Sequence, residues 1–212
     1  MYNYTTSKKH TDIDLSNFEE CFAPVKKVFK KGELIIKATS ENNKIGIIKK
    51  GTAYLTTINS DAQRRILEYY QNGNMIGKSF IPNNEGAIYY IIAKTDCTVD
   101  FISYQKLFTC CEKGCSKHIA IIDELLMTST RKAIMHIDII GQRTLKAKLL
   151  SYFEHLHLQK DSNCFTIPLP LTDLADYLAV DRSAMMREIK KLNQDNIIKS
   201  DKRKVTLLKD SN

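Results

Sequence analysis

Residues 171–183, which read LTDLADYLAVDRS, decide the fold of this 212-residue chain. Their apolar residues recur at helical spacing and predict the first of two short helices, Leu171–Leu178, and the start of the second, Asp181–Asn193. Only Ala179–Val180 separates the two helices, so the turn between them must be tight. This arrangement predicts a compact pair of crossing helices.

The two helices carry the residue types that a DNA-reading helix-turn-helix requires. Ala175 is small enough to let the second helix cross close to the first, and Ala179 keeps the turn small. Thr172 and Asp181 are the expected N-caps, because their side-chain oxygens can accept hydrogen bonds from free backbone N–H groups. The apolar residues expected to hold the pair together are Leu174, Leu178, Met185, Ile189 and Leu192.

Basic residues are concentrated in the second helix and in the segment after it. Between Arg182 and Lys209 the chain has nine Lys and Arg against three Asp and Glu, a net charge of +6 out of +8 for the whole chain. Such a cluster is the electrostatic footprint of nucleic-acid binding, although a basic surface that faces only water would have the same composition. The helix pair beside it favours nucleic acid.

The start of the second helix is where a recognition helix meets base edges. Arg182, Ser183 and Arg187 lie there; Arg suits bidentate contact with guanine, and Ser can bond several bases or a phosphate. Residues 197–208 predict a small basic hairpin after this helix. The residues expected to meet phosphates are Thr172, Lys190, Lys202, Arg203 and Lys204.

The first hundred residues show a different sequence pattern. Short apolar runs rich in β-branched and aromatic residues alternate with Gly and Asn, a pattern typical of an all-β sandwich or small barrel whose interior can hold a small ligand.

No stretch of the chain approaches the ~18 apolar residues of a membrane span. We see no signal peptide, and six cysteines are too sparse for a disulfide scaffold, so we expect a protein of the reducing cytoplasm.

A long helix is predicted over residues 116–140, where there is no Gly or Pro, with Gly141 as its stop. We interpret it as a dimerisation helix; the alternative is a helix packed wholly against its own chain. The predicted domains are then 1–115, 116–140 and 141–212. A second apolar stripe comprises Ile121, Leu125, Met135 and Ile139. The predicted dimer seam follows heptad spacing through Ile119, Ile122, Leu126, Ser129, Ala133, His136 and Ile140.

Over nearly its whole length the chain resembles the CRP/FNR family of bacterial transcription regulators. The resemblance rests on GNMIG at 73–77, AKTDCTV at 93–99, the long helix and residues 171–183, in that order. It implies an α+β fold with an N-terminal jelly-roll-like β-roll, a long dimerisation helix and a C-terminal winged helix-turn-helix. It also implies a homodimer on a near-palindromic double-stranded DNA operator, with RNA polymerase as a partner, and no enzyme and no membrane.

The chain departs from the cyclic-nucleotide members of the family at the phosphate and ribose positions. Lys78 stands where those members have Glu, and Ala87 and Ile88 stand where they have an Arg-Ser or Arg-Thr pair. An apolar pair cannot neutralise a buried phosphate. We therefore expect a signal other than cyclic AMP, and the candidates are a small molecule, a metal or a redox change. The candidate effector-pocket residues are Ile76, Lys78, Tyr89 and Leu125.

Thiols are concentrated just before the long helix. Cys110, Cys111, Cys115 and His118 form a cluster in which thiolate and imidazole are possible ligands for Zn, Fe or haem. A thiol–disulfide switch and simple packing of small side chains are the alternatives. Two other functions stay open: a Cys–His enzyme using Cys115 and His118, and a constitutive DNA-binding regulator whose β-roll is only a scaffold.

The recognition helix also departs from many relatives, which have Glu where this chain has Ser183. A Glu at this position would accept a hydrogen bond from a cytosine amino group. We therefore expect the same docking on DNA with a different preferred half-site.

Overall fold

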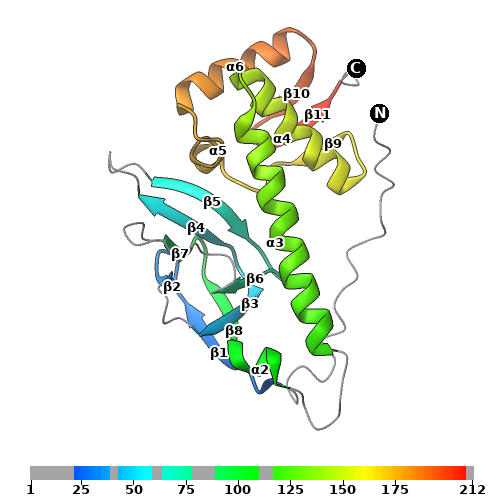
Figure 1. Cartoon of the computed structure of the whole chain (residues 1–212). Coiled ribbons are helices and arrows are strands. Elements are labelled where there is room, and N and C mark those ends of the chain that lie inside the picture. Colours follow the sequence, from blue (N-terminus) through cyan, green and yellow to red (C-terminus); the bar gives the residue numbers. More distant parts are fainter. Residues whose placement is uncertain (1–21, 39–42, 59–63, 78–88, 110–116, 209–212) are drawn as a thin grey trace. The chain divides into compact units, whose positions relative to one another are not determined.

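The computed structural model describes residues 22–38, 43–58, 64–77, 89–109 and 117–208 (Figure 1). The chain divides into two compact units. The first unit draws on the ranges 1–53, 70–86 and 91–129, and the second on 54–69, 87–90 and 130–212. A piece of the N-terminal half therefore belongs to the same unit as the C-terminal helices.

The N-terminal part is a β sandwich, as the short apolar runs predict. One sheet has the order β1-β8-β3-β6 and the other β2-β7-β4-β5. The strands are β1 (Val25–Phe29), β2 (Leu34–Ala38), β3 (Lys44–Lys50), β4 (Ala53–Ile58), β5 (Arg64–Tyr70), β6 (Met75–Gly77), β7 (Tyr89–Ala93) and β8 (Cys97–Ser103). Sequence patterning predicts every strand except β1, whose VKKVF segment is exposed at four of five positions.

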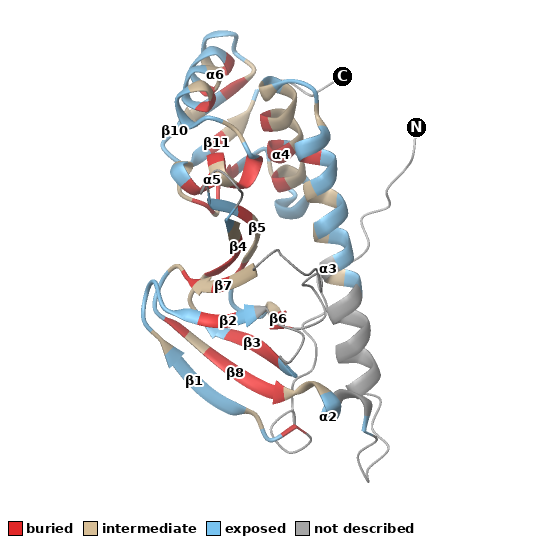
Figure 2. Cartoon of the chain, turned by 60° about the vertical axis from the view of Figure 1, so that its left-hand side comes forward, coloured by how far each residue is buried: buried red, intermediate tan, exposed pale blue. Residues whose placement is uncertain are grey.

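The sheet that contains β3 and β8 is tightly filled. Ile45, Ile76 and Val99 are each fully buried, and β3 pairs antiparallel with both β8 and β6. Gly46 is required here, because a Cβ on it would lie 2.7 Å from a methyl group of Val99. Figure 2 shows buried residues along both β3 and β8.

Within the described ranges, five helices and three strands follow the sandwich. The helices are α2 (Tyr104–Phe108), α3 (Lys117–Gly141), α4 (Leu145–Lys160), α5 (Leu171–Leu178) and α6 (Arg182–Gln194). The strands β9 (Cys164–Thr166), β10 (Ile198–Asp201) and β11 (Lys204–Leu207) form an antiparallel sheet of order β10-β11-β9. The predicted long helix and helix pair are confirmed, and the predicted hairpin gains β9 as a third strand.

One predicted cap is wrong. Thr172 lies inside the first turn of α5, and the N-cap is Pro170, which makes no side-chain hydrogen bond. Proline is suited to this place because its fixed φ leads directly into a helix and it has no N–H that needs a partner. The helix therefore begins at Leu171, two residues before a cap at Thr172 would place its start.

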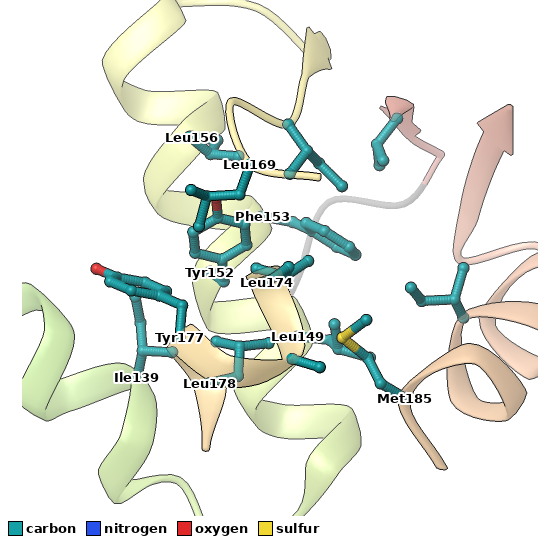
Figure 3. Close-up of a cluster of buried hydrophobic side chains, with 14 of the residues drawn as sticks. Ile139, Leu149, Tyr152, Phe153, Leu156, Leu169, Leu174, Tyr177, Leu178 and Met185 are labelled. Atoms are coloured by element: carbon teal, nitrogen blue, oxygen red, sulfur yellow. The ribbon is translucent and has the colours of Figure 1, made fainter. Parts of the chain in front are cut away.

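The second unit has one continuous apolar core (Figure 3). It joins Ile139 of α3 to α4, α5, α6 and the wing strands, and it includes Tyr54 and Ile66 from β4 and β5. Its labelled members in Figure 3 are Ile139, Leu149, Tyr152, Phe153, Leu156, Leu169, Leu174, Tyr177, Leu178 and Met185. Burial of these side chains fixes how the helix pair lies within its unit.

Helix α3 meets this core with one of its two apolar faces. Ile139 is fully buried and Met135 packs on the core, so the second apolar stripe faces the chain's own unit. Of the predicted seam residues with described side chains, Ala133 and Ile140 are exposed and His136 is half-buried. Ile134 and Ile137, which lie beside the predicted seam, are 62% and 65% exposed.

Among the described residues, no helix is long and apolar enough to cross a membrane.

Candidate nucleic-acid interface

The recognition helix α6 is fixed at its start by Asp181. The Asp181 carboxylate accepts a hydrogen bond from the backbone N–H of Ala184 at 2.7 Å, which confirms this residue as the N-cap. An acidic cap also complements the positive end of the helix dipole. On the inner side, Met185, Ile189 and Leu192 are buried in the core of the unit. These two constraints set the rotation of α6 about its axis.

The rotation turns the predicted base-reading residues outward. Arg182, Ser183 and Arg187 are all exposed on α6, and Lys190 is exposed one turn further on. Figure 2 shows this outer side of α6 in pale blue. Thr172 is exposed on the first turn of α5. The structure thus presents every helical residue of the predicted DNA surface to solvent.

The turn between α5 and α6 depends on small side chains, as the sequence predicts. Ala179 has a left-handed backbone with φ of 53°, and its N–H donates to the carbonyl oxygen of Ala175. The N–H of Val180 donates to the same oxygen at 3.1 Å. Ala175 is 2% exposed at the crossing. A larger residue at Ala175 would push the helices apart, because the site has no free space.

The wing presents a second group of basic side chains. Lys202 and Arg203 form the two-residue turn between β10 and β11, and both are exposed together with Lys204. Lys202 has a positive φ of 51°, which such a tight hairpin turn requires. The Arg203 carbonyl oxygen accepts a hydrogen bond from Ile167 N–H at 2.8 Å, which ties the turn to the segment before α5.

Asn193 joins the wing to the recognition helix, and sequence reasoning missed it. Its amide nitrogen donates to the Ser200 hydroxyl oxygen and to the Ile189 carbonyl oxygen, each at 2.8 Å. Its amide oxygen accepts from the Ser200 backbone N–H at 2.7 Å. The side chain thus uses both donor and acceptor to hold β10 against α6. A lone Asn at a helix C-terminus gives no sequence signal for such a role.

A polar contact also links the β4–β5 hairpin to α5. The Tyr54 hydroxyl donates to Asp173 at 3.0 Å, and Arg64 donates to Asp173 at 3.1 Å and to Asp176 at 2.7 Å. Asp173 is 2% exposed, so its charge depends on these partners. Burial and the Asp173 charge raise the pKa of Tyr54, which keeps its hydroxyl protonated as a donor. We call these four residues the hairpin–α5 contact.

His136 adds a third element to this region. Its Nε2 lies 2.8 Å from the Tyr177 carbonyl oxygen at the end of α5, and its ring stacks on the Tyr177 ring at 4.0 Å. The backbone of Leu67 on β5 also lies close to the ring. Burial lowers the pKa of His136, although the backbones of Tyr177 and Leu67 favour its protonated form. One side chain of α3 therefore touches both β5 and α5.

Nearby charges on the hairpin are buried as well. Glu68 forms an ion pair with Lys132 of α3 at 3.5 Å, and burial raises the pKa of Glu68. Burial and the Glu68 charge raise the pKa of Tyr69 to about 12. Tyr69 packs edge-on against Tyr177 with ring centroids 5.8 Å apart. The hairpin thus contacts α5 and α3 through both polar and aromatic groups.

Two of the predicted effector residues, Ile76 and Tyr89, have side chains that the structure describes. Ile76 is fully buried in the sheet, and Tyr89 is half-buried on β7. Lys78 and the side chain of Leu125 lie outside the described residues.

The cysteine cluster also lies beyond what the structure describes. Cys110, Cys111 and Cys115 fall outside the described ranges, as does the side chain of His118. Of the cysteines described, Cys97 is buried and Cys164 is exposed. No His, Cys, Asp and Glu within the described ranges form a group of three that could hold a metal ion.

Comparison with known families agrees with this arrangement. A model of the cyclic nucleotide-binding domain matches residues 26–113, and one of the Crp-like helix-turn-helix domain matches residues 147–210. The chain belongs to the CRP/FNR family. Members are DNA-binding transcription regulators without enzymatic activity, which removes the Cys115–His118 enzyme alternative. A search of curated proteins gave no match.

Solved structures share the fold at low sequence identity. OCPA-complexed CprK has a TM-score of 0.71 at 19% identity, covering 92% of this chain and 91% of CprK. A CooA mutant from Carboxydothermus hydrogenoformans has a TM-score of 0.72 at 12% identity, covering 96% and 94%. FixK2 from Bradyrhizobium japonicum has a TM-score of 0.65 at 16% identity, covering 88% and 93%. These likenesses concern the fold alone.

Removing the Asn193 side chain tests whether it positions the wing. We expect Asn193→Ala to lower the free energy of unfolding by about 1–3 kcal/mol, because Ser200 N–H loses its acceptor in a half-buried place. Affinity should fall for all DNA sequences alike, because the displaced wing carries the predicted phosphate-contacting residues. Thermal unfolding and fluorescence anisotropy on DNA measure the two effects. The exposed neighbour variant Gln194→Ala is the control, and equal behaviour of the two variants would contradict the role.

Proposed function

We propose that this DNA-binding regulator responds to a signal, and that the signal reaches the helix-turn-helix through the hairpin–α5 contact. The observation that carries the proposal is where the partners lie in the sequence. Tyr54 and Arg64 belong to the segment matched by the cyclic nucleotide-binding domain, and Asp173 and Asp176 belong to the segment matched by the helix-turn-helix domain. Both pairs lie within one compact unit.

This connection supports a shift between two populations of the protein. An effector that binds one arrangement of the β-roll better than another shifts the equilibrium by its difference in affinity. Movement of the hairpin would break or remake the bonds to Asp173, and α5 carries the turn that positions α6. A β-roll that served as a scaffold alone, the constitutive alternative, would not require buried polar partners on α5.

We propose that the signal is not cyclic AMP bound in the usual way. The support comes from Lys78, Ala87 and Ile88, which replace the charged and hydroxyl residues that hold the ribose and cyclic phosphate in the nucleotide-binding members. All three lie outside the described residues. Three kinds of signal remain candidates. They are a small molecule, a metal or haem, and oxidation of Cys110, Cys111 or Cys115.

Titration with cyclic AMP checks this part of the proposal. We expect no change in operator affinity and no binding at micromolar concentration, because an apolar pair leaves the phosphate charge without a partner. Isothermal titration calorimetry on the full chain measures binding directly. Micromolar affinity for cyclic AMP would contradict the proposal and leave the DNA-binding assignment untouched.

The proposed functional form is a homodimer on a near-palindromic operator, acting with RNA polymerase in the cytoplasm. The exposed stripe on α3 supports a second copy as its occupant. Met127, Ile134 and Ile137 follow heptad spacing and are 49%, 62% and 65% exposed. Two recognition helices related by a two-fold axis would then enter major grooves about 34 Å apart.

The base-reading and phosphate-contacting residues can be separated by mutation. We expect Arg187→Ala to cost about 1–3 kcal/mol on the selected operator and to relax its preference at one position in each half-site. Arg203→Ala should weaken binding to all sequences alike and reduce the salt dependence of log Kd by about one unit. Selection from a random duplex library, followed by anisotropy titrations at several salt concentrations, measures both.

Stoichiometry in the same titrations tests the homodimer, with two chains expected per operator. If Arg187→Ala left both the affinity and the sequence preference unchanged, the assignment of α6 as the recognition helix would be contradicted.

A further inference from the structure

One apolar side chain interrupts the polar outer surface of the recognition helix. Met186 is 40% exposed, and within α5 and α6, both described throughout, no other large hydrophobic residue is exposed. Its neighbour Met185 is fully buried and fills the core on the inner side of α6, whereas the Met186 side chain lies on the outer side. Isolated apolar residues on a surface are common, and the argument for a role therefore depends on where on the helix this one lies.

Helical geometry places Met186 among the predicted base readers. Successive residues of an α-helix turn by about 100°, which puts Arg182 about 40° to one side of Met186 and Ser183 about 60° to the other. Arg187 projects about 100° away in the direction of Ser183. Met186 thus lies inside the arc that these three residues define. If Arg182 and Arg187 both reach base edges, Met186 enters the groove between them.

The chemistry of the major groove offers one apolar partner. Guanine, cytosine and adenine present donors and acceptors there, whereas thymine also presents its C5-methyl group. Methionine has no hydrogen-bond donor, only a weakly accepting sulfur, and its flexible side chain adapts to an irregular apolar surface. Contact with a methyl group would remove apolar area of both partners from water.

We propose that Met186 contacts the C5-methyl group of a thymine in each half-site and so selects a T·A pair between the bases met by Arg182 and Arg187. The inference rests on the proposed function, because it needs α6 to be the recognition helix. It adds a specificity residue that recognises an apolar group of a base, whereas its neighbours recognise hydrogen-bonding groups.

Deoxyuridine in place of thymidine tests the proposal, because it removes the methyl group and leaves the hydrogen-bonding groups. The operator is first selected from a random duplex library with the unmodified protein. Each thymine of one half-site is then replaced in turn, and Kd is measured by fluorescence anisotropy at fixed salt. We expect one replacement to weaken binding about fourfold, the effect of one methyl-sized apolar contact.

The Met186→Ala variant should bind the thymine operator more weakly and show no difference between thymine and uracil at that position. Met186→Leu, which keeps an apolar side chain, should retain the difference. Leu158→Ala removes a 58% exposed apolar side chain from α4 and is the matched control, expected to behave as the unmodified protein. Circular dichroism verifies that each variant is folded.

Persistence of the full thymine–uracil difference in Met186→Ala would overturn the proposal, as would the absence of any sensitive thymine for the unmodified protein. Neither result would contradict the proposed function, provided that Arg187→Ala still changes operator preference. Failure to select any operator would instead reject the proposed function itself.

Discussion

A carboxylate that is almost wholly withdrawn from water is the constraint on which the DNA-binding half depends. Asp173 is 2% exposed, and an unpaired charge at such a place would cost several kcal/mol. The Tyr54 hydroxyl and the Arg64 guanidinium each donate a hydrogen bond to it. Since breaking a buried pair is far more costly than losing an exposed one, α5 and the β4–β5 hairpin are expected to move together.

The placement of the recognition helix follows from this constraint. Tyr177, one turn after Asp173, stacks on His136 and packs against Tyr69, so α5 is held on a second side. The turn at Ala179 then directs the chain into α6, and Asn193 fixes the wing to the end of α6. Each step transmits the position of α5 to the surface that meets DNA.

Local patterns in the sequence predict most of the fold and of the DNA surface. The two short helices, the Asp181 cap and the basic hairpin depend on neighbours within a few residues, which is why they can be predicted. Strand β1 is not predicted from the sequence, because adjacent lysines break its alternation of apolar and polar residues.

Contacts between distant residues could not be predicted. Tyr54 and Asp173 are 119 residues apart, and no spacing rule links a strand tyrosine to a helix aspartate. The inward face of α3 could not be predicted for a related reason: a helix with apolar residues on two faces does not reveal which face meets its own core. The packing of Ile139 and His136 decides this in favour of an exposed Ile134–Ile137 face.

Amide hydrogen exchange of the hairpin tests the central claim most directly, because coupling between two sites is reciprocal and needs no knowledge of the effector. If the hairpin–α5 contact transmits the signal, operator DNA should change exchange rates in β4 and β5 of the unmodified protein. This response should disappear in Arg64→Ala and persist in Arg65→Ala, which removes the same charge from an exposed neighbour. A hairpin that does not respond to DNA, or responds equally in both variants, would contradict the account.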